Sequence, residues 1–117
     1  MRIDIMTLFP DSLRGILDES IIGRAAKRGY ITIECHQIRD YTTNKQNQVD
    51  DYPYGGGRGC VMQAQPLYDC WRHICEDAGY RVHTIYMSPC GKVFKQADAK
   101  RLKNYDRLII VCGHYEG

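Results

Sequence analysis

The sequence contains no apolar stretch close to the roughly 20 residues that a helix needs to span a membrane. Its first residues also lack the long apolar segment and the small-residue cleavage site of a secretory signal peptide. These absences argue against a membrane or secreted protein, so we expect a cytoplasmic location and no membrane partner. With 117 residues, 44% of them hydrophobic and 26% charged, the chain has the size and composition of one globular domain.

The sequence also lacks any CxxC pair, although it contains six cysteines. Disulfide-stabilised domains are usually loop-rich and secreted, and a zinc site requires closely spaced pairs of ligands. The nearest pair, Cys70 and Cys75 with His73 between them, lies in a segment that has the period of one amphipathic helix. We therefore expect free thiols in a reducing compartment and no metal site.

Two nucleotide-binding signatures are absent as well. Neither GxxxxGK[ST] nor GxGxxG occurs, so the glycine-rich segment 54–59 (YGGGRG) does not have the pattern of a nucleotide phosphate loop. Three consecutive glycines allow the backbone to approach a ligand closely, but they are equally typical of a flexible surface loop. Just before them, Asp50 and Asp51 could accept hydrogen bonds from a base edge, steady the loop or remain solvated. The residues alone leave these alternatives open.

The net charge of +2 is too small to identify a nucleic-acid partner by itself. Basic residues nevertheless gather in two places along the chain. One group consists of Arg24, Lys27 and Arg28, and the other of Lys92, Lys95, Lys100, Arg101, Lys103 and Arg107. Such clusters can contact phosphates or form a solvated helix face, and charge alone does not decide between the two.

Hydrophobic periodicity predicts strands that alternate with helices. Strands are expected at residues 2–9, 30–38, 81–88 and 106–112, and helices from Pro10 and at 20–28, 66–78 and 94–104. Residues 39–59 have no periodicity and are expected to form a long loop. Pro10 suits the first turn of a helix, and Gly29 and Gly79 suit helix ends. This order predicts an α/β fold with a mainly parallel sheet flanked by helices.

Two of the predicted strands end in segments that could form one binding site. Residues 86–91 (YMSPCG) leave one strand through a Ser-Pro turn, and residues 113–117 (GHYEG) leave another through a glycine. If these strands are neighbours, both segments open on the same carboxyl edge of the sheet. Backbone groups there could bind a small polar ligand such as an adenine, with Tyr86 and Tyr115 as apolar walls. His114 and Glu116 could act in acid–base chemistry or be structural.

Several segments together resemble the bacterial tRNA (guanine-N1)-methyltransferase family, in order and from one end of the chain to the other. They are residues 5–10 (IMTLFP), 23–25 (GRA), 39–40 (RD), 49–59 (VDDYPYGGGRG), 86–91 (YMSPCG) and 113–117 (GHYEG). The DDYPYGGGRG run is highly specific. One mild departure is Cys90, where the family more often has glutamine.

The resemblance implies an α/β-knot (SPOUT) methyltransferase that works as a homodimer. Such enzymes bind S-adenosylmethionine in a bent shape within a deep trefoil knot. They transfer its methyl group to N1 of the guanosine immediately 3′ of the anticodon of a tRNA. Compared with that family, residues 1–117 are expected to be the N-terminal portion of the S-adenosylmethionine-binding catalytic domain, with the knot incomplete and the C-terminal tRNA-binding domain absent.

The resemblance also implies roles for single residues. Those expected to bind the cofactor are Tyr86, Ser88, Pro89, Gly113, Tyr115, Glu116 and Gly117. Those expected to bind the substrate are Asp50, Gly57, Arg58 and Gly59. Glu116 is further expected to help organise the reacting centre, with a magnesium ion as an additional cofactor.

In the family, the general base is an aspartate that lies in the part that would follow residue 117. A third cofactor-binding loop lies in that part as well. We therefore expect the 117 residues alone to transfer no methyl group and to bind the cofactor weakly or not at all. Two other functions remain open. One is a non-catalytic RNA-binding or dimerisation module that uses residues 92–107, and the other is a metal or redox protein that uses the cysteines. A steep salt dependence of RNA binding would support the first, and a zinc assay with a thiol count would test the second.

Overall fold

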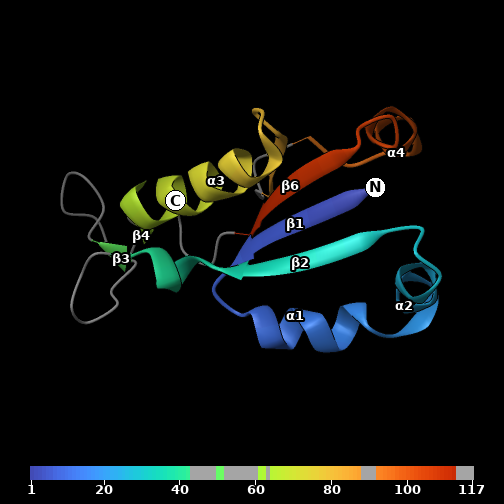
Figure 1. Ribbon diagram of the computed structural model, residues 1–117, viewed down its shortest axis with the longest axis horizontal. Helices are drawn as coiled ribbons and strands as arrows, with labels where there is room; N and C mark the ends of the chain where they lie inside the picture. The colour runs from blue at the N-terminus through green and yellow to red at the C-terminus, as the bar shows by residue number, and fades with distance from the viewer. Residues whose placement is uncertain (43–49, 52–60, 63, 88–91, 113–117) are drawn as a thin grey trace.

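A computed structural model of the chain describes residues 1–42, 50–51, 61–62, 64–87 and 92–112. Its centre is a four-stranded parallel sheet in the order β2-β1-β6-β5. The strands are β1 (Arg2–Thr7), β2 (Thr32–Gln37), β5 (His83–Met87) and β6 (Arg107–Cys112). Figure 1 shows β2, β1 and β6 side by side and pointing the same way. The mainly parallel sheet predicted from the sequence is therefore confirmed.

The helix α3 (Ala64–Ala78) covers one face of this sheet (Figure 1). Cys70 and Ile74, one turn apart on α3, are fully buried, as the helical period of the segment predicts. They belong to a core whose buried members are Met6, Leu8, Ile38, Cys70, Ile74, Val82, Ile109 and Val111. Because successive strand residues point to opposite faces, the even-numbered residues of β1 and the odd-numbered residues of β6 share this face.

The other three helices lie on the opposite face: α1 (Pro10–Leu17), α2 (Ser20–Lys27) and α4 (Gln96–Leu102). Ile33 of β2 lines a hollow with Leu17 of α1, and Leu108 of β6 lines a groove with Leu102 of α4. Ile33 and Leu108 both stand opposite Ile3 in the sheet register, so they share one face. The fold thus has helices on both sides of the sheet, as a parallel sheet requires.

The helix boundaries follow local chemistry. Pro10 is the first residue of α1, where its missing N–H costs no hydrogen bond. Gly29 and Gly79 follow α2 and α3 with φ values of +79° and +83°. Only glycine adopts this left-handed conformation without strain. These three predictions are confirmed.

The predicted loop over residues 39–59 is partly wrong. Its start belongs to the 3₁₀ helix η1 (Ile38–Tyr41), and near its end β3 (Asp50–Asp51) pairs antiparallel with β4 (Val61–Met62). The pairing joins Asp50 to Met62 and Asp51 to Val61, which flank the glycine-rich segment in the sequence. Elements this short have no hydrophobic period, so the sequence could not reveal them.

Tertiary contacts explain why η1 forms. The Gln37 amide Nε2 donates to the carbonyl of Leu8 at 3.0 Å, and its Oε1 accepts from the backbone N–H of Arg39 at 3.1 Å. These bonds fix the turn that places Ile38 in the core, where it is fully buried. Gln65 of α3 then donates to the carbonyl of Tyr41 at 2.6 Å. The turn is therefore held at its start by the bond to Leu8 and at its end by the bond from α3.

Three helices have other bounds than predicted, and α2 differs only in ending at Lys27 rather than at residue 28. α4 begins at Gln96 rather than at residue 94, because the Asp98 carboxylate accepts the backbone N–H of Lys95 at 3.0 Å and caps the helix there. It ends at Leu102 rather than at residue 104. α3 begins two residues before Pro66, which still lies in the first turn, where a residue without an N–H is tolerated. Within the described ranges, no helix is long and apolar enough to cross a membrane.

Candidate functional site

The strands β5 and β6 are parallel neighbours, as the binding-site hypothesis requires. In their register Tyr86 stands opposite Val111, and Met87 stands opposite Cys112. Both strands therefore end at the same edge of the sheet, with Met87 and Cys112 as their last residues. Ligands of open α/β sheets bind at this carboxyl edge.

Most of the residues that the sequence predicts for this site lie outside the described ranges. They are Ser88, Pro89, Gly113, His114, Tyr115, Glu116 and Gly117. Cys90 also lies outside them. Their cofactor-binding and catalytic roles therefore stay predictions.

Tyr86 is the one predicted cofactor residue within the described ranges. Its side chain is 47% exposed. It lines an open, mainly apolar hollow of about 280 Å³ together with Val111 at the end of β6 and with Leu67 and Trp71 of α3. An aromatic ring at the mouth of an apolar hollow can stack on a flat ligand group.

Two hydrogen bonds hold the start of β5 against α3. The Trp71 indole N–H donates to the Thr84 hydroxyl oxygen at 2.8 Å, and that hydroxyl donates to the carbonyl of Val82 at 2.9 Å. The guanidinium of Arg81 lies 5.8 Å from the centre of the Trp71 ring, within the range of a cation–π contact. These contacts fix the wall of the hollow on which Tyr86 lies.

Of the predicted substrate residues, too, only one lies within the described ranges. Asp50 belongs to β3, whose backbone pairs with β4, while Gly57, Arg58 and Gly59 lie outside the described residues. Figure 1 shows β3 and β4 near the start of α3, at the end of the sheet toward which the strands point. The strands β3 and β4, which flank the glycine-rich segment in the sequence, therefore lie at the same edge as the ends of β5 and β6.

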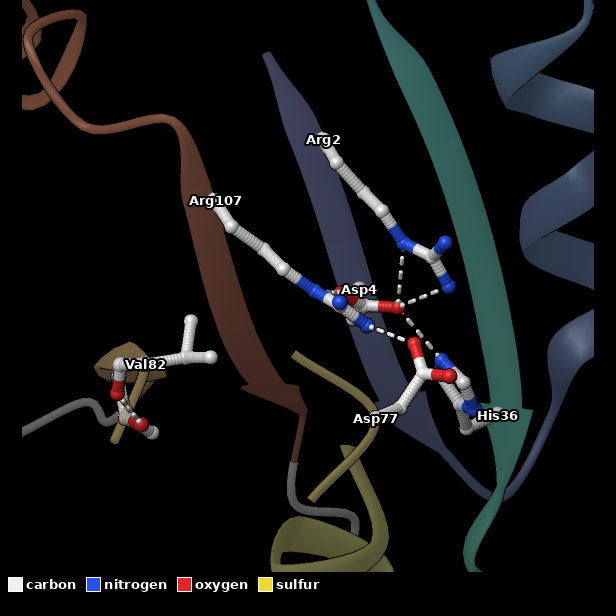
Figure 2. A network of polar contacts seen from close by, with 7 residues as sticks. Arg2, Asp4, His36, Asp77, Val82 and Arg107 are labelled. Carbon is white, nitrogen blue, oxygen red and sulfur yellow. Dashed lines mark hydrogen bonds and ion pairs between the residues drawn. The ribbon is translucent and has the colours of Figure 1, made fainter. Parts of the chain in front are cut away.

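A network of charged groups around Asp4 was not predicted. Asp4 is fully buried, and its carboxylate accepts hydrogen bonds from Arg107 Nε at 2.7 Å and from Arg2 Nη2 at 3.1 Å. His36 Nε2 lies 2.8 Å from the same carboxylate, and Arg107 also donates to Asp77 of α3 at 3.0 Å. Figure 2 shows Arg2, His36 and Arg107 converging on Asp4, while Asp77 contacts Arg107.

This network stabilises the fold and is not part of the candidate site at the carboxyl edge of the sheet. Burial alone would raise the pKa of the Asp4 carboxyl, but the hydrogen bonds from His36 and Arg107 outweigh it and hold that pKa well below its usual range. Asp4 lies in the middle of β1, away from the strand ends at which the candidate site lies. The one sequence signal is an acidic residue in the middle of a mainly apolar strand, because a carboxylate requires a partner if it is buried.

The thiols within the described ranges are unlike those of a redox or metal site. Cys35, Cys70, Cys75 and Cys112 are free, and burial raises the pKa of Cys70 to about 12. Burial also raises the pKa of Cys35 and of Cys112. A high pKa opposes the thiolate form that reacts or binds metal. Among the described residues, no three His, Cys, Asp or Glu side chains are grouped so that they could hold a metal ion.

Comparison with known proteins identifies relatives over the whole chain. The family model described as "tRNA (Guanine-1)-methyltransferase TrmD" matches residues 1–117. A tRNA (guanine-N(1)-)-methyltransferase of Lachnospira eligens is 49% identical over 117 residues, and one of Clostridium acetobutylicum is 50% identical over 117 residues. The match covers 100% of this chain in both cases, but 50% and 47% of the relatives. The chain thus spans about half the length of these relatives.

A solved structure gives the same result. The crystal structure of a tRNA (m1G37) methyltransferase from Aquifex aeolicus superposes with a TM-score of 0.91 and 29% sequence identity. The superposition covers 100% of this chain and 52% of that one. The α/β arrangement described above is therefore that of part of this structure.

Proposed function

The chain belongs to the tRNA (guanine-N1)-methyltransferase family, and from that premise we propose that residues 1–117 form part of the S-adenosylmethionine-binding catalytic domain of such an enzyme. The reaction proposed is transfer of a methyl group from S-adenosylmethionine to N1 of the guanosine 3′ of the anticodon in a tRNA. The observation that carries the proposal is the parallel pairing of β5 and β6, because Met87 and Cys112 then end neighbouring strands at one edge.

S-adenosylmethionine supplies a methyl group that its sulfonium charge has already activated, so the protein has mainly to bind and align it. We assign this binding to the edge residues Tyr86, Ser88, Pro89, Gly113, Tyr115, Glu116 and Gly117. Backbone N–H and C=O groups of the two segments bind the polar atoms, and the tyrosines contact the flat base. Support comes from Tyr86, whose half-exposed ring lines an apolar hollow beside the end of β6.

The acceptor requires different chemistry. N1 of guanine is a poor nucleophile while it is protonated, so a base must remove that proton and a donor must stabilise charge on O6. We assign recognition of the guanine to Asp50, Gly57, Arg58 and Gly59. The pairing of β3 with β4 supports this assignment, because these strands flank the glycine-rich segment and lie at the edge where β5 and β6 end.

Two further features of the proposal come from the family likeness. Glu116 helps to organise the reacting centre together with a magnesium ion, and the enzyme works as a homodimer. Sedimentation of the purified chain over a range of concentrations tests the second feature. A species with twice the mass of one chain is expected, and a monomer at all concentrations would contradict the homodimer for this chain.

A hybrid protein tests the activity. In it, residues 1–117 are followed by the part of the Lachnospira eligens relative that this chain does not match. We expect the hybrid to transfer a labelled methyl group from S-adenosylmethionine to a tRNA with guanosine 3′ of the anticodon. The chain without the added part should transfer none, because the family draws its general base from that part. A folded hybrid that binds the cofactor but methylates no guanosine would contradict the proposed reaction.

The matched control keeps the protein and changes the substrate. A tRNA with adenosine in place of the target guanosine carries a 6-amino group where guanine has O6, so a site built to stabilise charge on O6 has no acceptor to bind, and the adenosine should accept no methyl group at that position. Equal methylation of the two tRNAs would show that the hybrid acts elsewhere on the RNA.

A further inference from the structure

The side chain of Gln65 joins two parts of the chain that flank β3 and β4 in the sequence. Gln65 lies in the first turn of α3, and its amide Nε2 donates to the backbone carbonyl of Tyr41 at 2.6 Å. Tyr41 is the last residue of η1, and the chain between η1 and α3 contains the paired strands β3 and β4. The chain therefore leaves η1 and enters α3 at neighbouring points, which the Gln65 bond ties together.

The neighbours of the Gln65 amide fix its orientation. Asp69, one turn further along α3, accepts a second hydrogen bond from Gln65 Nε2 at 2.6 Å. The Tyr41 carbonyl and the Asp69 carboxylate are both acceptors, so only the NH2 end of the amide can face them. One N–H is thus directed to each oxygen, and Asp69 helps to hold the other N–H on the Tyr41 carbonyl.

Other contacts also hold η1 in place, so this region does not depend on the Gln65 bond alone. Ile38, at the start of η1, is fully buried in the core. The ring of Tyr41 lies 5.7 Å from that of His73, which is two turns along α3 from Gln65. Loss of the Gln65 bond should therefore free the backbone that follows Tyr41 without unfolding the protein.

The strands that this bond ties down lie at the candidate site. Figure 1 shows β3 and β4 near the start of α3, at the edge where β5 and β6 end. β4 ends at Met62, three residues before Gln65, and β3 begins with Asp50, which the proposed function assigns to guanine recognition. A side chain that fixes the base of this region also fixes where the β3–β4 pair lies relative to the ends of β5 and β6.

We propose that Gln65 is a positioning residue for methyl transfer. Its bond to the Tyr41 carbonyl holds the β3–β4 pair so that the guanine bound there faces the methyl donor at the β5–β6 edge. This inference rests on the proposed function, because the positioned group is the acceptor of that reaction. It requires no contact of Gln65 with either substrate. A displacement of the acceptor by about 1 Å can lower the rate of such a reaction about 100-fold.

Three replacements separate the hydrogen-bond donor of Gln65 from the size of its side chain. Gln65→Met keeps the length and removes both N–H groups, while Gln65→Glu keeps the shape and presents only acceptor oxygens to the Tyr41 carbonyl. Gln65→Lys restores a donor. The four residue types have similar helix propensities, so α3 should be equally stable in all variants. Asp77→Asn is the matched control, because it weakens a bond to Arg107 at the other end of the same helix.

Single-turnover methyl transfer by the hybrid protein gives the functional readout. Gln65→Met and Gln65→Glu should lower the rate by about 10- to 100-fold, and Gln65→Lys should stay within about threefold of the unmodified hybrid. The affinity for S-adenosylmethionine should stay within about twofold in every variant, because the cofactor is assigned to the β5–β6 edge. Asp77→Asn should change neither quantity. An unchanged rate with Gln65→Met, or a rate with Gln65→Lys as low as with Gln65→Met, would overturn the inference.

Hydrogen exchange of the 117-residue chain gives a readout that requires no activity. The backbone amides of β3 and β4 should exchange at least about tenfold faster in Gln65→Met but not in Gln65→Lys, while those of β1 stay unchanged. Equal exchange in Gln65→Met and the unmodified chain would also overturn the inference. Faster exchange, together with a hybrid that binds cofactor but methylates no guanosine, would contradict the proposed function and leave in place the role of Gln65 in holding the β3–β4 pair.

Discussion

Arg107 donates a hydrogen bond from Nε to the buried Asp4 carboxylate at 2.7 Å, although the two residues are 103 positions apart in the chain. Asp4 lies on β1 and Arg107 begins β6, so the pair joins two neighbouring central strands that are far apart in the sequence. Arg107 continues to Asp77 at 3.0 Å and thereby ties the end of α3 to the same strands. The contact therefore requires strands from the two ends of the described sequence to pair in the centre of the sheet.

Asp4→Asn should destabilise the protein strongly. The replacement removes the charge partner of Arg107, whose side chain is only 10% exposed, and breaking a buried ion pair typically costs about 3–5 kcal/mol. Urea denaturation followed by circular dichroism measures the free energy of unfolding. Asp77→Asn is the matched control, because the Asp77 side chain is 57% exposed and its loss should cost about 1 kcal/mol or less. Equal costs for the two variants would contradict this account of the network.

The stability should fall in acid through the same group. The pKa of Asp4 is held below its unfolded value of about 3.9, so the unfolded chain binds more protons and stability rises with pH in this range. The contribution of Asp4 is thus fully present above about pH 5 and is lost progressively as the pH falls below that value. Unfolding free energies measured from pH 7 to pH 2 should fall more steeply for the wild type than for Asp4→Asn. Parallel curves would show that the pKa of Asp4 is not lowered in the folded protein.

Cys70 should resist alkylation in the folded protein. Its side chain is fully buried, and burial raises its pKa to about 12, so the reactive thiolate is nearly absent at pH 8. Cys75 lies on the same helix and is partly exposed, so it serves as the internal control. Arg72 separates the two thiols, and trypsin therefore places them on different peptides for mass spectrometry. Iodoacetamide should label Cys75 first and Cys70 only in denaturant, and equal labelling rates would contradict the burial of Cys70.

Trp71 and Thr84 should be energetically coupled. The indole N–H bond to the Thr84 hydroxyl joins α3 to β5, and a typical hydrogen bond of this kind contributes about 0.5–1.5 kcal/mol. A double-mutant cycle with Trp71→Phe and Thr84→Val should give a coupling energy in that range. Additive losses would mean that the bond does not help to hold β5.

Local chemistry predicted much of this fold, because several signals are contained in single residues. Pro10 begins α1, and Gly29 and Gly79 end helices in the conformation that only glycine adopts easily. The alternation of strands and helices likewise predicted the parallel sheet. The start of α4 was misplaced because Asp98 caps the helix behind Phe94, a contact that hydrophobic periodicity does not register.

Longer-range features could not be predicted. The Asp4 network depends on residues from β1, β2, β6 and α3, and no local pattern links them. The 3₁₀ turn at Ile38 depends on Gln37 reaching the carbonyl of Leu8 across the chain. Of the candidate site, the sequence predicted the meeting of the two strand ends through topology, while the hollow beside Tyr86 required the packing of α3 to be known.

The decisive measurement is the affinity of the hybrid protein with Tyr86→Ala for S-adenosylmethionine, determined by calorimetry. It tests whether the methyl donor binds at the β5–β6 edge. We expect binding at least about tenfold weaker than that of the unmodified hybrid, because the variant lacks the ring that we propose contacts the flat base. Tyr80→Ala is the matched control, since Tyr80 is 51% exposed, close to the 47% of Tyr86, and belongs to no strand end of the candidate site. Its affinity should be unchanged. Unchanged affinity with Tyr86→Ala, or an equal loss with Tyr80→Ala, would contradict the binding of the methyl donor at the β5–β6 edge.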